Sequence, residues 1–480
     1  MKKCSELIKK KWLINRFKTI FIVVLLISIY IGINVLVQRL ELTDIDVTQN
    51  KLYTISSESI DKIKNIEKEV IIYFFGFEKN EKIIDLAKQY SKNNSNIIIQ
   101  NIKITDRPDL MEKYNLQDGD DVIVIQSGDR NKILTSSDLS TYDYTTYEEI
   151  DLTEQKLTNS ILDITADEKP SIYFLTGHKE YTLESHMIIL SEYLKNEVNE
   201  VKSLDLLVTN KIPEDCSVLA ICSPTEDFKD FETQLIMDYI NNGGKIIFLN
   251  DPSFKDALSN VQKILDLFGL SFDNKGILLE EDASKMVMQT PNLIKPDISY
   301  TDITKNIASD GGVAFLSSSK IDFKEDNEME ELGLSVENLI TSSKTAFYRN
   351  DLTITTNTKT NQDEQSEFTI GALISKKIDE NTSSKIIVIA NNSFATDYQI
   401  NIAEQRIPCI YLYNNKDLIL NAIAYLTNKE DKITIRKDIG SVTYTVTEEQ
   451  DRLIKVIIFG IPIIIIATGI IVWQVRRRRK

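Results

Sequence analysis

Four short polar segments of the sequence carry the side chains that could do chemistry, and each follows a run of apolar residues. The candidate side chains are an imidazole, two carboxylates and two hydroxyls: His178, Glu180, Ser223, Asp251 and Ser393. Polar groups of these kinds orient bound ligands. Ligands of open parallel sheets bind at the carboxyl ends of the strands, so these residues could share one binding crevice. The alternative is ordinary turn chemistry, because Gly, Asn, Asp and Ser are common wherever a strand ends.

A nucleophile paired with a base is missing from this set. Cys222 ends an apolar run, where amidotransferase-like folds carry their cysteine, but Ile221 and Pro224 do not suit the small-residue elbow that exposes a nucleophile. Both histidines, His178 and His186, precede that cysteine in the chain. We therefore expect no catalytic residue and no enzymatic activity, with structural roles for Cys222 and His186.

Cofactor and metal motifs are also missing from the 480 residues. The four cysteines, at positions 4, 216, 222 and 409, are too scattered for a zinc cluster or a disulfide scaffold. Neither a Walker A sequence nor the dinucleotide-binding G-x-G-x-x-G pattern occurs. We expect no cofactor and no bound metal.

Alternating strands and helices are expected to position these segments in an α/β fold with two modules. The first, over residues 40–150, has helices near 57–65 and 81–91 and strands at 69–75, 96–103 and 121–126. A thioredoxin-like arrangement is one candidate for it. The absence of a C-x-x-C sequence excludes thiol–disulfide chemistry there.

The second module is expected over residues 151–431 and is amidotransferase- or flavodoxin-like. Its strands, at 171–176, 217–222, 245–250 and 385–390, are almost continuously apolar, which is typical of a parallel sheet covered on both faces. One intervening helix is marked by Phe231, Leu235 and Tyr239 and is closed by a glycine pair. Residues 280–370 are less periodic, and we expect an insertion of short strands and loops.

Both ends of the chain are predicted to cross a membrane. The segments 19–39 and 454–475 each contain an uncharged apolar run, of 17 and 20 residues, that can span a bilayer as a helix. Basic tails at 1–18 and 476–480 place both termini in the cytoplasm by the positive-inside rule. The two modules, with a β-stem and linker at 432–453, would then lie outside a bacterial cell membrane. A cleaved signal peptide is the alternative for the first run.

The part between the two runs is strongly acidic. Residues 40–454 contain 42 basic and 71 acidic side chains, a net charge of −29, whereas the whole chain carries −16. Such a surface repels phosphate groups, so we exclude nucleic acid as a partner. The lipid bilayer that the two apolar runs would cross remains an expected partner.

Several motifs occur in an order that resembles the Gldg-type family of ABC-transporter auxiliary proteins, first associated with gliding motility. They are DVTQNKLYTIS at 46–56, LTGHKE at 175–180, YINNGGKIIFLND at 239–251, the segment 420–427, and the final apolar run with its arginine tail. Lys179 stands where the family often has a glycine. Because a glycine allows a ligand to approach the backbone closely and a lysine does not, this replacement weakens the case that the loop binds a ligand in that way.

The resemblance implies a non-enzymatic membrane component that works with an ABC ATP-binding subunit and a multi-span ABC permease. It also implies an exterior part in which a thioredoxin-like module precedes an amidotransferase-like module without catalytic residues. We expect this exterior part to engage a substrate or partner. The alternatives are a cell-envelope scaffold and an ecto-enzyme that uses the strand-end crevice.

Truncating a loop side chain that has no special contacts lowers the free energy of unfolding by less than about 0.5 kcal/mol. If the crevice binds a ligand, replacing His178 and Asp251 with alanine should therefore lower function and leave the melting temperature nearly unchanged.

Overall fold

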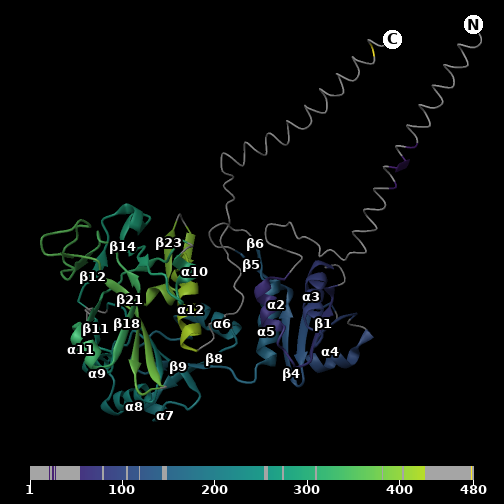
Figure 1. The fold of residues 1–480 in the computed structure, drawn as a ribbon, viewed down its shortest axis with the longest axis horizontal. Coiled ribbons are helices and arrows are strands. Elements are labelled where there is room, and N and C mark those ends of the chain that lie inside the picture. The colour runs from purple at the N-terminus through teal and green to yellow at the C-terminus, as the bar shows by residue number, and fades with distance from the viewer. Residues whose placement is uncertain are drawn as a thin grey trace, which may run out of the picture. The chain divides into compact units, whose positions relative to one another are not determined.

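A computed structural model describes most of the part between the two apolar runs (Figure 1). The described residues are 55–77, 81–103, 106–117, 119–142, 149–252, 258–272, 275–308, 311–380, 382–402 and 405–427, with Phe21, Val24, Leu25, Ser28 and Arg477. The predicted spans, basic tails and stem lie outside them, apart from those five single positions. Within the described residues, no helix combines the length and apolar character that a membrane crossing requires.

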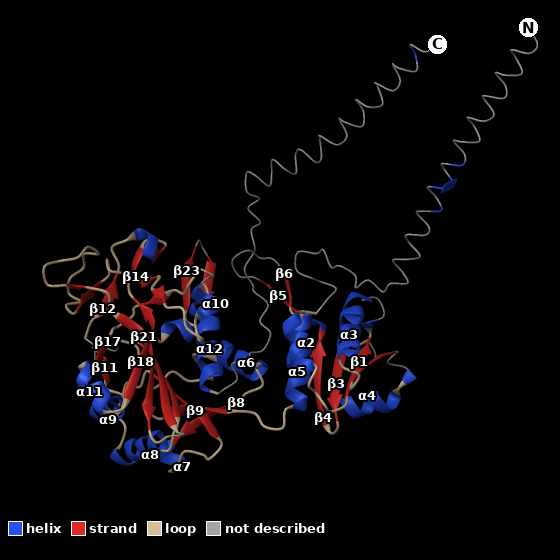
Figure 2. Ribbon diagram, in the orientation of Figure 1, coloured by secondary structure: helices blue, strands red, loops and turns tan. Residues whose placement is uncertain are grey.

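The first module is built on a four-stranded sheet in the order β2-β1-β3-β4. Figure 2 labels β1, β3 and β4 of this sheet. Its strands are β1 (Val70–Phe75), β2 (Ile97–Ile102), β3 (Val122–Ser127) and β4 (Arg130–Thr135). Strand β1 pairs parallel with β2 and antiparallel with β3, which forms a hairpin with β4. The strands expected at 69–75, 96–103 and 121–126 are confirmed. Strand β4 has mainly polar, exposed residues and therefore lacks the apolar pattern that marks the others.

Four helices complete this module: α2 (Ser57–Ile63), α3 (Glu81–Asn93), α4 (Pro108–Tyr114) and α5 (Thr153–Thr165). Helix α5 buries Leu157 and Ile161 in the same core as strand β1. Glu154 of α5 also accepts a hydrogen bond from the Ser56 backbone N–H at 2.6 Å. Helix α5 thus shares the core of the first sheet, although the sequence assigned residues from 151 onward to the second module. Strands β5 (Ser140–Tyr142) and β6 (Glu149–Asp151) form a separate short hairpin.

The second module is built on an eight-stranded sheet in the order β15-β18-β21-β22-β10-β9-β7-β8. Five neighbouring strands are parallel: β7 (Ser171–Thr176), β8 (Glu200–Asp205), β9 (Cys216–Cys222), β10 (Lys245–Leu249) and β22 (Ser383–Ile389). Its larger helices are α6 (Ile188–Asn196), α8 (Asp230–Asn241), α9 (Ser259–Asp266) and α12 (Asn415–Leu426). The four predicted strands of this sheet are confirmed.

The sheet is mixed, whereas the sequence predicted a parallel one. Strands β21 (Thr369–Lys377), β18 (Leu334–Thr341) and β15 (Asp297–Ile298) extend it antiparallel from β22. The apolar side chains Ile370 and Ile374 make β21 a buried strand, and a tight turn in which the Ile378 N–H donates to the Thr382 carbonyl reverses the chain into β22. The segment 280–370 therefore contributes one long strand, β18, to the main sheet, together with β15 and the start of β21, as well as the short strands that we expected.

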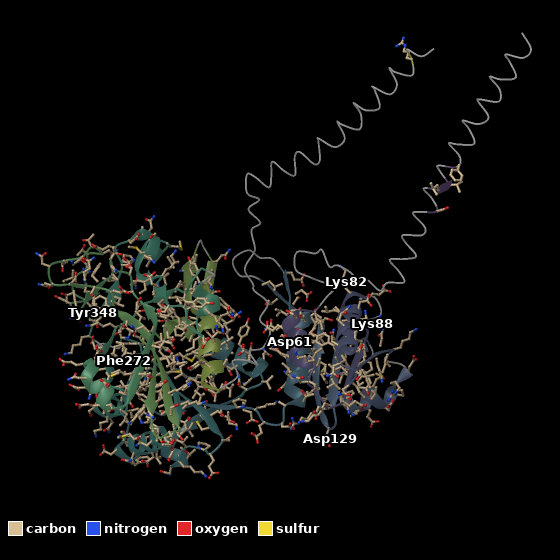
Figure 3. All side chains as sticks on the ribbon, in the orientation of Figure 1. Asp61, Lys82, Lys88, Asp129, Phe272 and Tyr348 are labelled. Carbon is tan, nitrogen blue, oxygen red and sulfur yellow. The ribbon has the colours of Figure 1, made fainter. Side chains whose placement is uncertain are left out.

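Short elements surround this sheet in the described residues. The strands are β11 (Leu270–Phe272), β12 (Ile277–Leu279), β13 (Met286–Val287), β14 (Thr290–Ile294), β16 (Phe315–Leu316), β17 (Ile321–Phe323), β19 (Phe347–Arg349), β20 (Glu364–Gln365), β23 (Gln399–Ile402) and β24 (Gln405–Pro408). The short helices are α7 (Leu206–Thr209), α10 (Lys305–Ala308) and α11 (Asp326–Glu331). Figure 3 labels two of the aromatic side chains in this region. Phe272 stacks on Phe248 of β10, and the Tyr348 hydroxyl accepts the Gly276 N–H at 3.0 Å.

Candidate functional site

The five predicted site residues follow strands whose carboxyl ends lie at one edge of the main sheet. Strands β7, β9, β10 and β22 are parallel neighbours, so the loops that leave them emerge on the same side. His178 and Glu180 follow β7, and Ser223, Asp251 and Ser393 follow the other three strands. The local contacts of these residues differ, and only His178 and Glu180 share a polar cluster.

His178 is buried between two glutamates. Its exposed fraction is 3%, and its Nε2 and Nδ1 atoms lie 3.1 Å from Glu232 and 3.5 Å from Glu180. Both glutamates are themselves almost fully buried. Neither imidazole nitrogen makes a hydrogen bond of good geometry within the described residues. The Phe228 ring packs edge-on against the imidazole, with 4.8 Å between ring centroids.

The loop after β7 bends sharply to place this histidine. Gly177 and Lys179 have φ angles of +118° and +59°, and the left-handed region favours glycine. The Glu180 carboxylate accepts the His178 backbone N–H at 2.7 Å. The His178 carbonyl in turn accepts the N–H groups of Thr225 and Glu226, from the loop after β9. The segment predicted as a polar loop is thus a closed turn that buries the side chains of His178 and Glu180 and leaves Lys179 exposed.

Glu232 is a site residue that the sequence prediction missed. Helix α8 buries Glu232, Ile236 and Ile240, and its Phe231 is 42% exposed. The buried stripe is therefore shifted by one residue from the stripe expected from Phe231, Leu235 and Tyr239. The sequence did contain a signal for Glu232, which lies four residues before Ile236 and eight before Ile240 and so on the same face of the helix. A carboxylate on a buried helix face requires a polar partner, which marks the position as a candidate site residue.

Ser223 and Ser393 hold backbone together. The Ser223 hydroxyl donates to the Leu249 carbonyl at 3.1 Å and thereby ties the end of β9 to that of β10. The Ser393 hydroxyl lies 3.0 Å from the Leu316 carbonyl and 3.0 Å from the Asn391 side-chain oxygen. These contacts favour the turn-chemistry interpretation for both serines.

Asn392 is a second polar group of this edge that the prediction missed. It is fully buried, and neither atom of its side-chain amide has a hydrogen-bond partner within the described residues. A run of small polar residues at a strand end is ordinary turn composition, so the sequence contained no signal that would single out this position.

Asp251 is the most accessible acid of the predicted set. It is half-buried, and the Tyr181 hydroxyl donates to it across 3.4 Å. Burial raises the pKa of this carboxyl to about 6, against the smaller lowering effect of the tyrosine. Burial also raises the pKa of Tyr181 to about 12, so the phenol remains a donor at neutral pH.

Asp251→Asn is expected to flatten the pH dependence of stability between about pH 4 and pH 6. Because the folded carboxyl has the higher pKa, the native state binds the extra proton in this window, and the wild-type free energy of unfolding falls as the pH rises through it. Above pH 6 the variant should be more stable by on the order of 1 kcal/mol, allowing for partial solvent screening. Urea unfolding at pH 5 and pH 8 measures this effect, with exposed Asp266→Asn as the control. An unchanged slope in Asp251→Asn would contradict the assignment.

Cys222 ends β9 inside the core rather than at its surface. Its exposed fraction is 1%. Burial, with a smaller contribution from the charge of Glu180, raises the pKa of the thiol. Since the thiolate is the nucleophilic form, this cysteine is poorly suited to attack a substrate.

Cys222→Ser is accordingly expected to leave the function of the protein intact. A buried hydroxyl in place of the thiol should cost about 1–3 kcal/mol of stability, so Cys222→Ala is measured beside it. Loss of function in both variants at normal folding and abundance would restore the catalytic interpretation.

The described part of the chain is a two-module mixed α/β protein with a buried polar cluster at the strand-end edge of its larger sheet. The chain belongs to the family described as "ABC-type uncharacterized transport system", whose sequence profile matches residues 169–422, more than half of its length. This family indicates an auxiliary component of an ABC-type transport system. No curated protein matches the sequence.

Several solved structures are similar to parts of the chain. The "mmIFT52 N-terminal domain" is 14% identical with a TM-score of 0.39, over 54% of this chain and 97% of that one. A putative ThuA-like protein from Bacteroides uniformis is 11% identical with a TM-score of 0.31, over 54% and 93%. A glutamine amidotransferase from Thermotoga maritima is 8% identical with a TM-score of 0.27, over 56% and 87%. Identities and TM-scores this low carry no functional information.

Proposed function

We propose that the protein is a non-enzymatic, membrane-anchored auxiliary subunit of an ABC-type transporter, of the Gldg type. Its exterior domain would engage a substrate or a partner. Membership of the ABC-type transport family supports the transporter assignment. The observation that carries the non-enzymatic part is the burial of Cys222, with its raised thiol pKa, at the strand end where a nucleophile would be expected. His178 is almost fully buried, which leaves it poorly placed to take a proton from a substrate.

The proposed architecture combines a thioredoxin-like and an amidotransferase-like module between two membrane spans. The order strand, helix, strand, helix, hairpin, helix in residues 70–165 supports the first module. The five parallel strands β22-β10-β9-β7-β8 support the second. The spans and the cytoplasmic placement of both termini rest on the apolar runs and their flanking basic residues.

An ecto-enzyme is the second candidate, and Asp251 is the observation that favours it. A carboxyl with a pKa near 6 beside a tyrosine hydroxyl has the properties of a general acid or base. In that case Asp251→Asn should abolish function although it does not lower the free energy of unfolding, whereas an auxiliary subunit should retain function.

The proposed partners are tested by affinity purification of the tagged full-length chain from its host in mild detergent. We expect an ABC ATP-binding subunit and a multi-span permease to co-purify. An equally tagged unrelated two-pass protein serves as the control. Absence of both subunits, even after crosslinking in intact cells, would overturn the proposal.

The proposed topology is tested by cysteine labelling with a membrane-impermeant maleimide. Asn327→Cys, on the exposed helix α11, should label in intact cells, and Arg477→Cys should label only after permeabilisation. Cys4 and Cys216 are replaced by serine in both strains. Labelling of Arg477→Cys in intact cells, or protection of Asn327→Cys, would reverse the topology.

A further inference from the structure

At the antiparallel end of the main sheet, part of strand β18 has a neighbouring strand on one side only, within the described residues. Strand β15, the outermost strand, pairs with β18 only at Ile340 and Thr341. Residues 334–338 of β18 therefore pair on one side alone, with β21, within the described residues. Four of these five residues are exposed, and Val336 retains 40% of its surface. An unpaired strand edge of this kind is a template for another strand.

The register shows which backbone groups of this edge face outward. The Lys377 N–H donates to the Gly333 carbonyl at 3.1 Å, so these two residues form a hydrogen-bonded pair of the β18–β21 ladder. Hydrogen-bonded and non-hydrogen-bonded pairs alternate in an antiparallel ladder. The N–H and C=O groups of Leu334, Val336 and Asn338 consequently point away from β21. Their spacing of two residues matches the hydrogen-bonding repeat of an added strand.

A pocket lies against the same three residues. It has a volume of about 430 Å³, and its apolar walls include Phe323, Met329, Leu334 and Val336. Pockets of this size hold apolar groups in other proteins. The edge thus offers backbone hydrogen bonds beside a recess for a side chain.

The rim of this pocket is acidic. Asp326 and Glu330 line it. Exposed acids of the adjoining segment extend the negative surface: Glu325, Glu328, Glu331 and Glu337. The cation of the rim, Lys324, is paired with Glu328 at 3.9 Å. Charge complementarity therefore favours a basic occupant.

We propose that residues 334–338 form a docking edge for an extended basic segment of a partner protein. The segment adds as a strand beside β18, an apolar side chain enters the pocket, and its lysines or arginines face the acidic rim. In strand addition, backbone hydrogen bonds supply affinity and pockets for alternate side chains supply specificity. This surface lies on β18, three strands from β10 in the sheet order, so the proposal is independent of the strand-end residues.

The test uses the purified full-length chain in detergent and a fluorescent peptide of sequence Lys-Val-Lys-Phe-Lys-Val-Lys with blocked ends. We expect saturable binding, together with slower hydrogen exchange at the amides of Leu334, Val336 and Asn338. A peptide N-methylated at alternate residues, which cannot pair as a strand, should bind at least about tenfold more weakly. A version with glutamate in place of lysine should not bind.

Two variants address the edge and the rim separately. Val336→Pro removes an outward N–H without interrupting the β21 ladder and should weaken binding about tenfold. Glu330→Lys should weaken binding severalfold, whereas Glu67→Lys, an equal charge change on the first module, should not. If Val336→Pro lowers the melting temperature, Glu330→Lys and the N-methylated peptide still decide the outcome.

Four results would overturn the proposal. Three concern the peptide: the absence of saturable binding, equal binding of the N-methylated peptide, and exchange protection confined to other residues. The fourth is concentration-dependent dimerisation that protects the same amides without peptide, because a second copy would then occupy the edge.

Discussion

His178→Ala is expected to destabilise the second module by about 3 kcal/mol, because it opens a cavity beside Phe228 and leaves two buried side chains without their neighbouring polar group. The imidazole lies within 3.1 Å of Glu232 and 3.5 Å of Glu180, and both glutamates are buried. Without the imidazole, neither buried glutamate would have a polar ring beside it. This outcome replaces the expectation from the sequence that changing His178 together with Asp251 would leave the melting temperature nearly unchanged.

Urea unfolding of the full-length chain measures this effect, followed by a signal specific to the second module. His186→Ala is the matched control, because the second histidine is exposed and its ring nitrogen contacts Ser185 and the Thr182 N–H. His186→Ala should lower the free energy of unfolding by less than about 1 kcal/mol. Equal stabilities of wild type and His178→Ala would show that the buried cluster does not contribute to the stability of the second module.

Asp363→Asn is expected to cost about 3–5 kcal/mol, because it breaks a buried ion pair. Arg349 is bidentate to this carboxylate, with Nε and Nη2 at 3.0 Å and 2.7 Å from its two oxygens. The same guanidinium donates to the carbonyls of Thr356 and Thr358, so one side chain secures the segment 350–363. The exposed fractions of the Arg349 and Asp363 side chains are 3% and 2%.

The same pair predicts an acid dependence of stability. Hydrogen bonds from Arg349 hold the pKa of Asp363 at about 2, below its ordinary value. Its stabilising contribution is therefore complete above about pH 4 and is lost as the pH falls toward 2. Hydrogen exchange of residues 350–363 at pH 3 and pH 6 should show this loss in the wild type and little pH effect in Asp363→Asn. Asp351→Asn is the control, since that carboxylate is exposed and caps Thr353. Unchanged protection in Asp363→Asn would contradict the prediction.

Local sequence patterns predicted most of the strands and helices, because the spacing of apolar residues in each element reflects which of its faces are buried. Strands β1, β7, β9, β10 and β22 are buried, and each is marked by a run of apolar residues. The glycine pair after α8 closes that helix as expected, with Gly243 at a φ of +84°. Strands β18 and β4 were harder to predict, because edge strands with exposed faces lack a strong apolar pattern.

The residue pattern was enough to predict the alternation of strands and helices, the likeness to ABC-transporter auxiliary proteins, and the strand ends from which the polar loops emerge. It did not show which polar side chains are buried together, because that depends on the packing of distant segments. His178 and Glu232 are far apart in the sequence, and their contact depends on how α8 is turned against the sheet. The free edge of β18 was equally hidden, because the sheet order depends on pairing between distant segments. Periodicity reports what one element buries, whereas a site depends on which elements become neighbours.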